Sequence, residues 1–158
     1  MRKIHLIAAL SAVAALLVGC GPNTQFTLPG DFVAMTDEEI AWKDYDWKAV
    51  NPDGAVVVLR ERDNDQKGSL DFWYKALKKE VVEGKGYDLL DDSEMKTRNM
   101  TGRIMTFTTE YGGTPYQYAV AIFVVDDTIV TIETALSDEN IEKHGDAVRK
   151  IVESAYFD

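Results

Sequence analysis

The sequence predicts an α+β domain, in which an antiparallel sheet of about five to seven strands packs with two long amphipathic helices. Three observations support this prediction. A strong turn signal at residues 51–54 separates two strand-like segments. Two segments with apolar residues at helical spacing, near residues 69–86 and 137–155, flank four strand-like segments. The short joints between those four segments indicate a meander, and a meander makes the sheet antiparallel.

The first predicted element is a β-hairpin. Before the turn, Trp47 and Ala49 alternate with polar residues, as in a strand with one buried face. In the turn, Pro52 fixes its own φ and Gly54 is free to take a positive φ. The apolar run that follows, residues 55–62, completes the hairpin.

A helix is predicted next, over residues 69–86. Ser69 can cap its start, and Gly84 and Gly86 can end it. Its apolar residues recur at helical spacing, so one side of the helix must pack on the sheet. This stripe consists of Leu70, Trp73, Leu77 and Val81.

Four β-segments follow, at residues 87–96, 102–111, 116–125 and 128–136. In the third segment both alternate sets of side chains are apolar from Ala119 onward, which predicts a central strand covered on both faces. A second helix then begins after Ser137. Its predicted buried face consists of Ile141, His144, Val148, Ile151, Val152 and Ala155.

This order of elements, over about residues 26–157, resembles the PsbP-like fold. That fold is shared by the photosystem subunit PsbP, the Ran-binding factor Mog and the bacterial envelope proteins LpqN and DcrB. The resemblance rests on element order and on no diagnostic motif. It implies a role in binding or assembly, because the fold mostly serves those purposes, and it implies no particular chemistry.

Residues 1–19 have the composition of a signal peptide. Arg2 and Lys3 supply positive charge, and residues 4–18 are almost entirely apolar. This apolar stretch suits a signal peptide and falls short of the roughly 20 residues that a membrane-spanning helix needs. The segment ends in Leu17–Cys20, which resembles the lipobox of bacterial lipoproteins.

In that family the cysteine thiol receives a diacylglycerol, a peptidase cuts just before the cysteine, and the new amino terminus is usually acylated. The resemblance therefore implies cleavage between Gly19 and Cys20 and a membrane anchor through lipid on Cys20. Gly21 stands where Asp would favour inner-membrane retention in enteric-type bacteria. We therefore expect the outer membrane, facing the periplasm, in a Gram-negative host, with the inner membrane as the alternative.

The remaining chain divides into a short tether at residues 20–25 and one α+β domain at residues 26–158. The five residues after Cys20 reach at most about 18 Å, so the domain should stay close to its membrane. Removing residues 1–19 leaves 15 basic residues against 27 acidic ones, a net charge of −12. This charge disfavours nucleic acid and anionic lipid surfaces as partners. No cysteine follows Cys20, so the domain has no disulfide.

The mature chain offers few residues for catalysis or for holding a cofactor, and we expect neither an enzyme nor a cofactor. His144 is its single histidine, and its place on an apolar helix stripe predicts a half-buried structural role. A zinc site needs three or four suitable ligands, which one histidine does not supply. The turn at residues 63–68 begins like a calcium loop, but Lys67 and Tyr74 stand where oxygen ligands are needed.

Aromatic residues are the remaining feature. Trp47, Phe72 and Trp73 are predicted to pack in the core, whereas Trp42, Tyr74 and Tyr116 are candidate partner-binding residues. The sequence therefore favours a lipid-anchored envelope protein that binds a protein partner of unknown identity. A carrier of a small ligand or lipid, with an apolar pocket, is the first alternative. A hydrolase is the second, and it would require a cleft that gathers His144, a serine and an acid.

Overall fold

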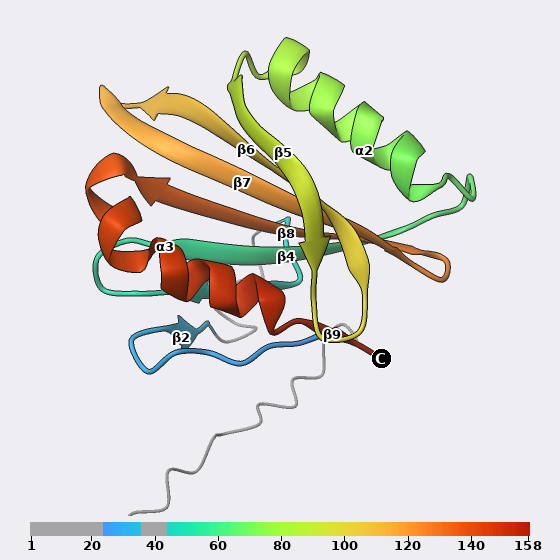
Figure 1. The fold of residues 1–158 in the computed structure, drawn as a ribbon, viewed down its shortest axis with the longest axis horizontal. Helices are drawn as coiled ribbons and strands as arrows, with labels where there is room; N and C mark the ends of the chain where they lie inside the picture. Colours follow the sequence, from blue (N-terminus) through green and yellow to red (C-terminus); the bar gives the residue numbers. More distant parts are fainter. Residues whose placement is uncertain (1–23, 36–43) are drawn as a thin grey trace, which may run out of the picture.

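The computed structural model describes residues 24–35 and 44–158, and it confirms the α+β prediction (Figure 1). Seven strands form one antiparallel sheet in the order β2-β3-β4-β8-β7-β6-β5. The elements are β1 Thr24–Gln25, β2 Val33–Ala34, β3 Trp47–Val50, β4 Val56–Asp63, α2 Leu70–Lys79, η1 Glu80–Gly84, β5 Asp88–Lys96, β6 Thr101–Tyr111, β7 Thr114–Val125, β8 Thr128–Ser137, α3 Asp138–Glu153 and β9 Tyr156–Phe157.

The helices are shorter than the two long helices that the sequence predicts. Ser69 starts α2 as expected, since its hydroxyl accepts from the amide of Phe72 at 3.2 Å. The helix has 10 residues and then changes to the five-residue π-helical segment η1. Helix α3 has 16 residues. Within the described ranges, no helix is both long and apolar enough to cross a membrane.

The predicted hairpin docks on the meander through a pairing of distant segments. Strands β3 and β4 pair across the Asn51–Gly54 turn, and β4 then lies beside β8. This register runs from Val56 opposite Ala135 to Asp63 opposite Thr128. Strand β7 is central, as predicted, and its residues 120–123 are buried. The hairpin thus extends the sheet on the side away from β5.

Each face of the sheet has its own hydrophobic cluster. Helix α3 packs on β8 and β7 over the larger cluster, which includes Leu59, Phe123 and Ile151. Helix α2 packs on the opposite face over β6 and β7, where Phe107 and Val81 are fully buried. The two helices therefore cover different parts of opposite faces, and this offset determines which part of the sheet remains accessible.

The two ends of the described chain pair with each other. Thr24 lies opposite Phe157 and Gln25 opposite Tyr156 in a small separate sheet of β1 and β9. Phe157 is buried, and its amide and carbonyl are both bound by the side chain of Asn99. Thr24 and Gln25, which the sequence assigns to the tether, thus pair with the end of the domain.

The aromatic core predictions are correct for two residues of three. Trp47 is half-buried and stacks on Phe26 with ring centroids 4.5 Å apart. Trp73 is half-buried too, and its indole N–H donates to Oδ1 of Asn64 at 2.8 Å. Phe72 is 54% exposed, so its core assignment is wrong. It neighbours Trp73 on the helix, and only one of two adjacent residues can face the sheet.

Candidate functional site

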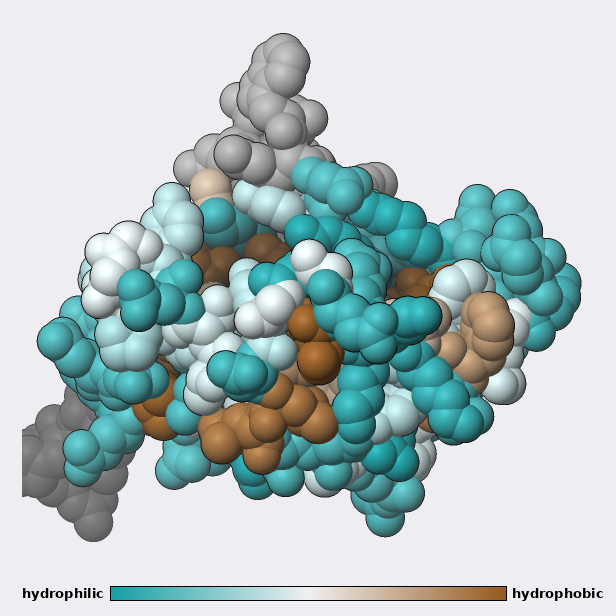
Figure 2. All heavy atoms as spheres, turned by 90° about the horizontal axis from the view of Figure 1, so that it is seen from above, coloured by the Kyte–Doolittle hydropathy of each residue, from teal (hydrophilic) through white to brown (hydrophobic). Residues whose placement is uncertain are grey.

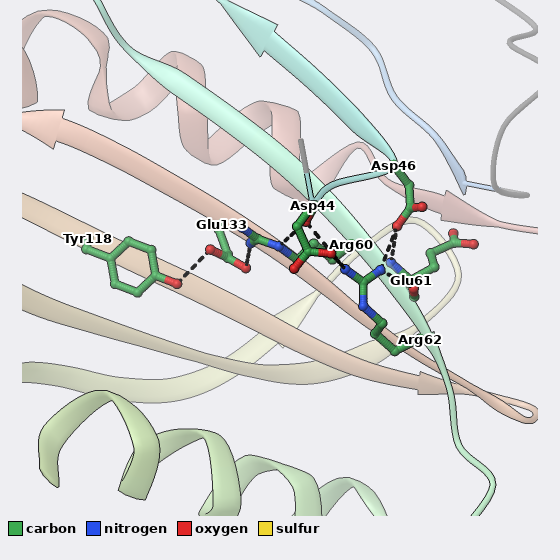
Figure 3. A network of polar contacts seen from close by, with 7 residues as sticks. All are labelled: Asp44, Asp46, Arg60, Glu61, Arg62, Tyr118 and Glu133. Carbon is green, nitrogen blue, oxygen red and sulfur yellow. Dashed lines mark hydrogen bonds and ion pairs between the residues drawn. The ribbon is translucent and has the colours of Figure 1, made fainter. Parts of the chain in front are cut away.

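The candidate site is the part of the sheet face that lies beside α2 and is not covered by it. Side chains of β4, β8 and β7 point to this face, because Val58 pairs with Glu133 and Ala135 pairs with Tyr118. Figure 3 shows these strands with α2 to one side and α3 behind the sheet. Val58 and Ala135 are half-buried. We call this surface the open face.

A polar network crosses the open face from strand to strand (Figure 3). The hydroxyl of Tyr118 donates to Oε2 of Glu133 at 2.8 Å, and the other oxygen of that carboxylate pairs with the guanidinium of Arg60. Nε of Arg60 donates to the carbonyl oxygen of Asp44 at 2.6 Å. The side chains of Arg60 and Glu133 are 29% and 17% exposed. The central ion pair is therefore partly shielded from water while remaining accessible.

The network continues outward into a more exposed group. Arg62 pairs with the carboxylate of Asp44 and lies 3.3 Å from Oδ2 of Asp46. The backbone amide of Glu61 donates to the same Asp46 oxygen at 2.6 Å. These contacts fix the chain just before β3 against β4. The open face is thus bordered by alternating cations and anions.

Burial and the neighbouring charges fix the protonation states at the centre. Burial raises the pKa of Tyr118, and the Glu133 carboxylate raises that pKa further. Burial lowers the pKa of Arg60. The hydrogen bond to Glu133 and the negative charge of Glu133 outweigh the effect of burial, so the pKa of Arg60 is raised overall. Tyr118 therefore stays a neutral donor and Arg60 stays a cation. This arrangement suits recognition by fixed charges and hydrogen bonds better than proton transfer.

Tyr116, one of the predicted partner-binding residues, lies on this same face. It precedes Tyr118 by two residues on β7, pairs with Ser137 and is half-buried. The ring of Tyr118 is also held edge-on by Tyr87, with centroids 5.7 Å apart. Tyr116 and Tyr118 thus place aromatic side chains beside the Arg60–Glu133 pair. Whether Tyr116 binds a partner remains a prediction.

The other predicted site residues lie elsewhere. Tyr74 is buried, with 9% of its surface exposed, because its hydroxyl donates to Asp92 from beneath α2. This candidate partner-binding residue is therefore buried against the sheet, and its binding to a partner stays a prediction. Trp42, Gly19 and Cys20 lie outside the described residues.

Asp92 is the centre of a second polar group, which fastens α2 to the sheet. Tyr74 and Arg103 both donate to it, and Nζ of Lys78 lies 3.0 Å from its Oδ2. The guanidinium of Arg103 also stacks 4.6 Å from the centroid of the Tyr74 ring. Partial burial pushes the pKa of Asp92 upward, but the bonds from Tyr74, Arg103 and Lys78 outweigh it and lower the pKa from 3.8 to about 2. These bonds link the carboxylate of Asp92 to α2 and β6, whereas Nε of Arg103 is buried without a hydrogen-bond partner in the described chain.

His144 is more buried than predicted, with 5% of its surface exposed. Its Nε2 lies 2.8 Å from Oδ2 of Asp53, and its Nδ1 lies 3.5 Å from Oδ2 of Asp31. Asn140 donates to the carbonyl oxygen of Asp53 at 2.8 Å. The histidine therefore joins α3 to the hairpin turn and to the loop before β2. Both of its polar neighbours in the described chain are carboxylates, so this is not the serine-containing cleft that a hydrolase would require.

The described residues contain no cluster of three or more histidine, cysteine or acidic side chains placed to hold a metal ion. Asn64, in the calcium-like turn, is bound to Gly68 and Trp73 instead. A cavity of about 110 Å³ lies between β1, β4, β8 and β9, and Glu61 and Asp158 are among its lining residues. Pockets for small ligands usually hold about 300–1,000 Å³. This cavity is smaller than that, and a second hollow of about 490 Å³, beside Lys79, Glu80 and Gly84, is shallow and open to solvent rather than enclosed.

The sequence reasoning missed the central pair of the network. Arg60 and Glu133 each lie inside a predicted strand, where a charged residue interrupts an apolar or threonine-rich run. Two charges of opposite sign inside apolar strands are a sequence signal for an ion pair, since buried or half-buried charges are usually paired. Pairing β4 with β8 would have been needed to bring them together.

Comparison with solved structures identifies the fold. Cyanobacterial PsbP from Synechocystis sp. PCC 6803 aligns with a TM-score of 0.61 and 8% identity, covering 86% of this chain and 87% of that one. LpqN of Mycobacterium tuberculosis, involved in cell envelope biogenesis, aligns with a TM-score of 0.62 and 14% identity, covering 88% and 86%. The Saccharomyces cerevisiae Ran-binding protein Mog1p aligns with a TM-score of 0.55 and 13% identity, covering 85% and 89%.

These likenesses show that the domain has a PsbP-like fold, as its element order suggested. At such low identities they show the fold and leave the function open. No protein-family model matches the chain. No curated protein matches it in sequence either.

Proposed function

We propose that this chain is a lipid-anchored protein of the bacterial envelope whose domain binds a protein partner on its open face. The observation that carries the proposal is the half-buried Tyr118–Glu133–Arg60 network, which lies on a sheet face beside α2. Tyrosine and arginine are the residue types that contribute most to binding at protein interfaces. Val58, Ala135 and Tyr116 add partly exposed apolar area around the network.

A role in binding fits the geometry better than a role as a carrier or as an enzyme. The 110 Å³ cavity is too small for a drug-sized ligand or a lipid. His144 contacts the carboxylates of Asp31 and Asp53 and is nearly inaccessible to a substrate. The open face, in contrast, presents half-buried side chains with fixed charges. The neighbours support the same role by analogy, since LpqN is involved in envelope biogenesis and Mog1p binds Ran.

The envelope location and the lipid anchor rest on the sequence. Leu17–Cys20 resembles a lipobox, and residues 2–18 resemble the signal that precedes one. In the sequence, only Gly21, Pro22 and Asn23 separate Cys20 from β1. The proposed anchor would therefore hold the β1–β9 end of the domain next to the bilayer.

Site-specific photo-crosslinking in the native host tests the partner surface. A photoreactive phenylalanine analogue replaces Tyr116 in one strain and Lys150 in the other. Lys150 is a suitable control because it is exposed and lies on α3, which packs on the opposite face of the sheet. We expect a discrete adduct with one envelope protein from position 116 and none from position 150.

Substitution then tests whether the contact matters. Tyr116→Ala should reduce recovery of that envelope protein several-fold with an unchanged melting temperature, whereas Lys150→Ala should leave recovery intact. Equal adducts from both positions, or undiminished recovery with Tyr116→Ala, would show that the partner does not use the open face.

A further inference from the structure

Strand β5 forms one edge of the main sheet, with β6 on its inner side. It has 9 residues, seven of which are exposed, and Asp92 and Met95 are the two that are not. An edge strand presents outward-pointing N–H and C=O groups that another strand can pair with. The register shifts between Leu89 and Asp91, so the strand carries a bulge near its start.

The β5 edge combines apolar and acidic side chains. Leu89 and Leu90 are 38% and 56% exposed, which is high for large apolar residues. Figure 2 looks down on the end of the molecule where α2 and the start of β5 lie, and hydrophobic patches there interrupt a largely hydrophilic surface. The strand also contains four acidic residues against Lys96 alone. An apolar anchor with surrounding negative charge is thus available along an unpaired edge.

The acids differ in whether they are already neutralised. Asp92 is bound by donors from α2 and β6, and Glu94 lies 3.3 Å from Lys96. Within the described chain, Asp88 and Asp91 form no ion pair with a basic side chain. These two carboxylates flank Leu89 and Leu90. The edge therefore has uncompensated negative charge on both sides of its exposed leucines.

We propose that β5 binds an extended, cationic segment of a partner protein, which adds to the sheet as a further strand. The main-chain groups of β5 would supply the hydrogen bonds, as in other cases of strand addition. Asp88 and Asp91 would pair with Lys or Arg side chains, and Leu89 and Leu90 would contact an apolar side chain. The site is separate from the open face and goes beyond the function proposed there.

Charge selects this occupant over a second copy of the chain. Two β5 strands side by side would bring together two segments that each carry four acids and one lysine. Like charges directly opposite each other destabilise strand pairing. A cationic segment would instead place positive side chains opposite the acids of β5, which is an attractive arrangement. The same acids that discourage self-association thus favour a basic partner.

Binding of a defined peptide tests the proposal on the full chain in detergent micelles. The probe is a short capped peptide of alternating lysine and valine. Its matched controls are the same peptide with glutamate in place of lysine, and the lysine peptide N-methylated at alternate backbone nitrogens. We expect the lysine peptide to slow amide hydrogen exchange in β5. Both controls should leave that exchange unchanged, because one has the wrong charge and the other lacks the backbone donors.

Charge reversal separates the β5 edge from the general acidity of the domain. The double variant Asp88→Lys, Asp91→Lys should lower the affinity for the lysine peptide roughly tenfold, since two exposed ion pairs become two repulsions. The control variant Glu142→Lys, Glu153→Lys makes the same change in net charge on exposed positions of α3. It should retain the wild-type affinity within about twofold.

The reversed variant should also gain binding of the glutamate peptide at β5. Protection that appears outside β5, equal losses in the two double variants, or binding of the N-methylated peptide would each overturn the proposal. So would a dimer formed through β5 in the absence of peptide. Melting curves of both double variants establish that they are folded, as expected for substitutions at exposed positions.

Discussion

At the scale of single residues, Asp92 links α2 to the sheet through three polar contacts. Its side chain is 18% exposed and receives bonds from Tyr74, Arg103 and Lys78, which lie on two different elements. Since each donor depends on the others for its position, the group acts as one fastening between α2 and the β5–β6 edge. A change at Asp92 should therefore affect how firmly α2 is held.

Asp92→Asn should lower the free energy of unfolding by about 2 kcal/mol at neutral pH, from the difference between a pKa of 3.8 and one of about 2. The pKa is lower in the folded state than in the unfolded state. The ionised carboxylate therefore stabilises the fold above pH 3.8, and this contribution is lost as the pH falls toward 2. Urea unfolding of both proteins across this range should show the stability difference shrinking as the pH drops.

Asp91→Asn is the matched control, because Asp91 is adjacent, exposed and outside the Asp92 group. It should change stability by no more than about 0.5 kcal/mol. A loss from Asp92→Asn that stays constant down to pH 2 would mean that charge is not what the carboxylate contributes.

Residue environments were the least predictable feature from sequence. The position of His144 on a helix stripe was visible and the burial of Tyr74 was not, and their partners Asp53 and Asp92 lie 91 and 18 residues away in the sequence. Arg60 and Glu133 are separated by 73 residues. A hydrogen-bond partner at such separations depends on the docking of whole elements, and no local pattern encodes it.

At the scale of elements, the packing of β7 against β6 leaves no room for a side chain at Gly102. A Cβ at this position would collide with the carbonyl oxygen of Ile122 and with the ring of Phe123. A backbone atom cannot move aside as a flexible side chain can. The glycine is thus required where β6 meets β7 against a fully buried aromatic residue.

Gly102→Ala should therefore destabilise the fold by about 1–3 kcal/mol, the usual effect of overpacking. Gly145→Ala is the contrasting variant, since the nearest atom to its Cβ would be a side-chain carbon of Ile141 at 3.9 Å. Replacing this glycine inside α3 should raise stability by about 0.5–1 kcal/mol. Thermal unfolding of the two variants should give shifts of opposite sign, and a neutral Gly102→Ala would show that the strands can separate at low energetic cost.

The elements themselves were predicted well where the local signal was strong. The four β-segments agree with the sequence prediction to within two residues at each end. Strands β1, β2 and β9 were not predicted, because each has 2 residues and depends on a distant partner. The π-helical end of α2 was also missed, since glycine marks the end of a helix without revealing how its last turn is wound.

At the scale of the whole molecule, the lipid anchor can be tested apart from the fold. Cys20→Ser should abolish labelling by a fatty-acid analogue and leave residues 1–19 attached, because the thiol is the group that forms the thioether with lipid. Labelling in the host and the mass of the purified protein measure both effects. Adding Thr114→Cys to the variant restores a thiol at an exposed position and should not restore labelling. Labelling that persists in Cys20→Ser would exclude lipid attachment at this residue.

The pairing of β1 with β9 also makes the chain suitable for circular permutation. Because Thr24 lies opposite Phe157, a short linker could join Asp158 to Thr24. New ends could be made between Gly112 and Gly113, at the opposite end of β6 from the turn that contacts Phe157. Strand β6 has 11 residues, so the attachment point would move by about 35 Å. Grafting residues 1–23 onto the new amino terminus would turn the domain end over end with respect to the bilayer while preserving its strand pairings.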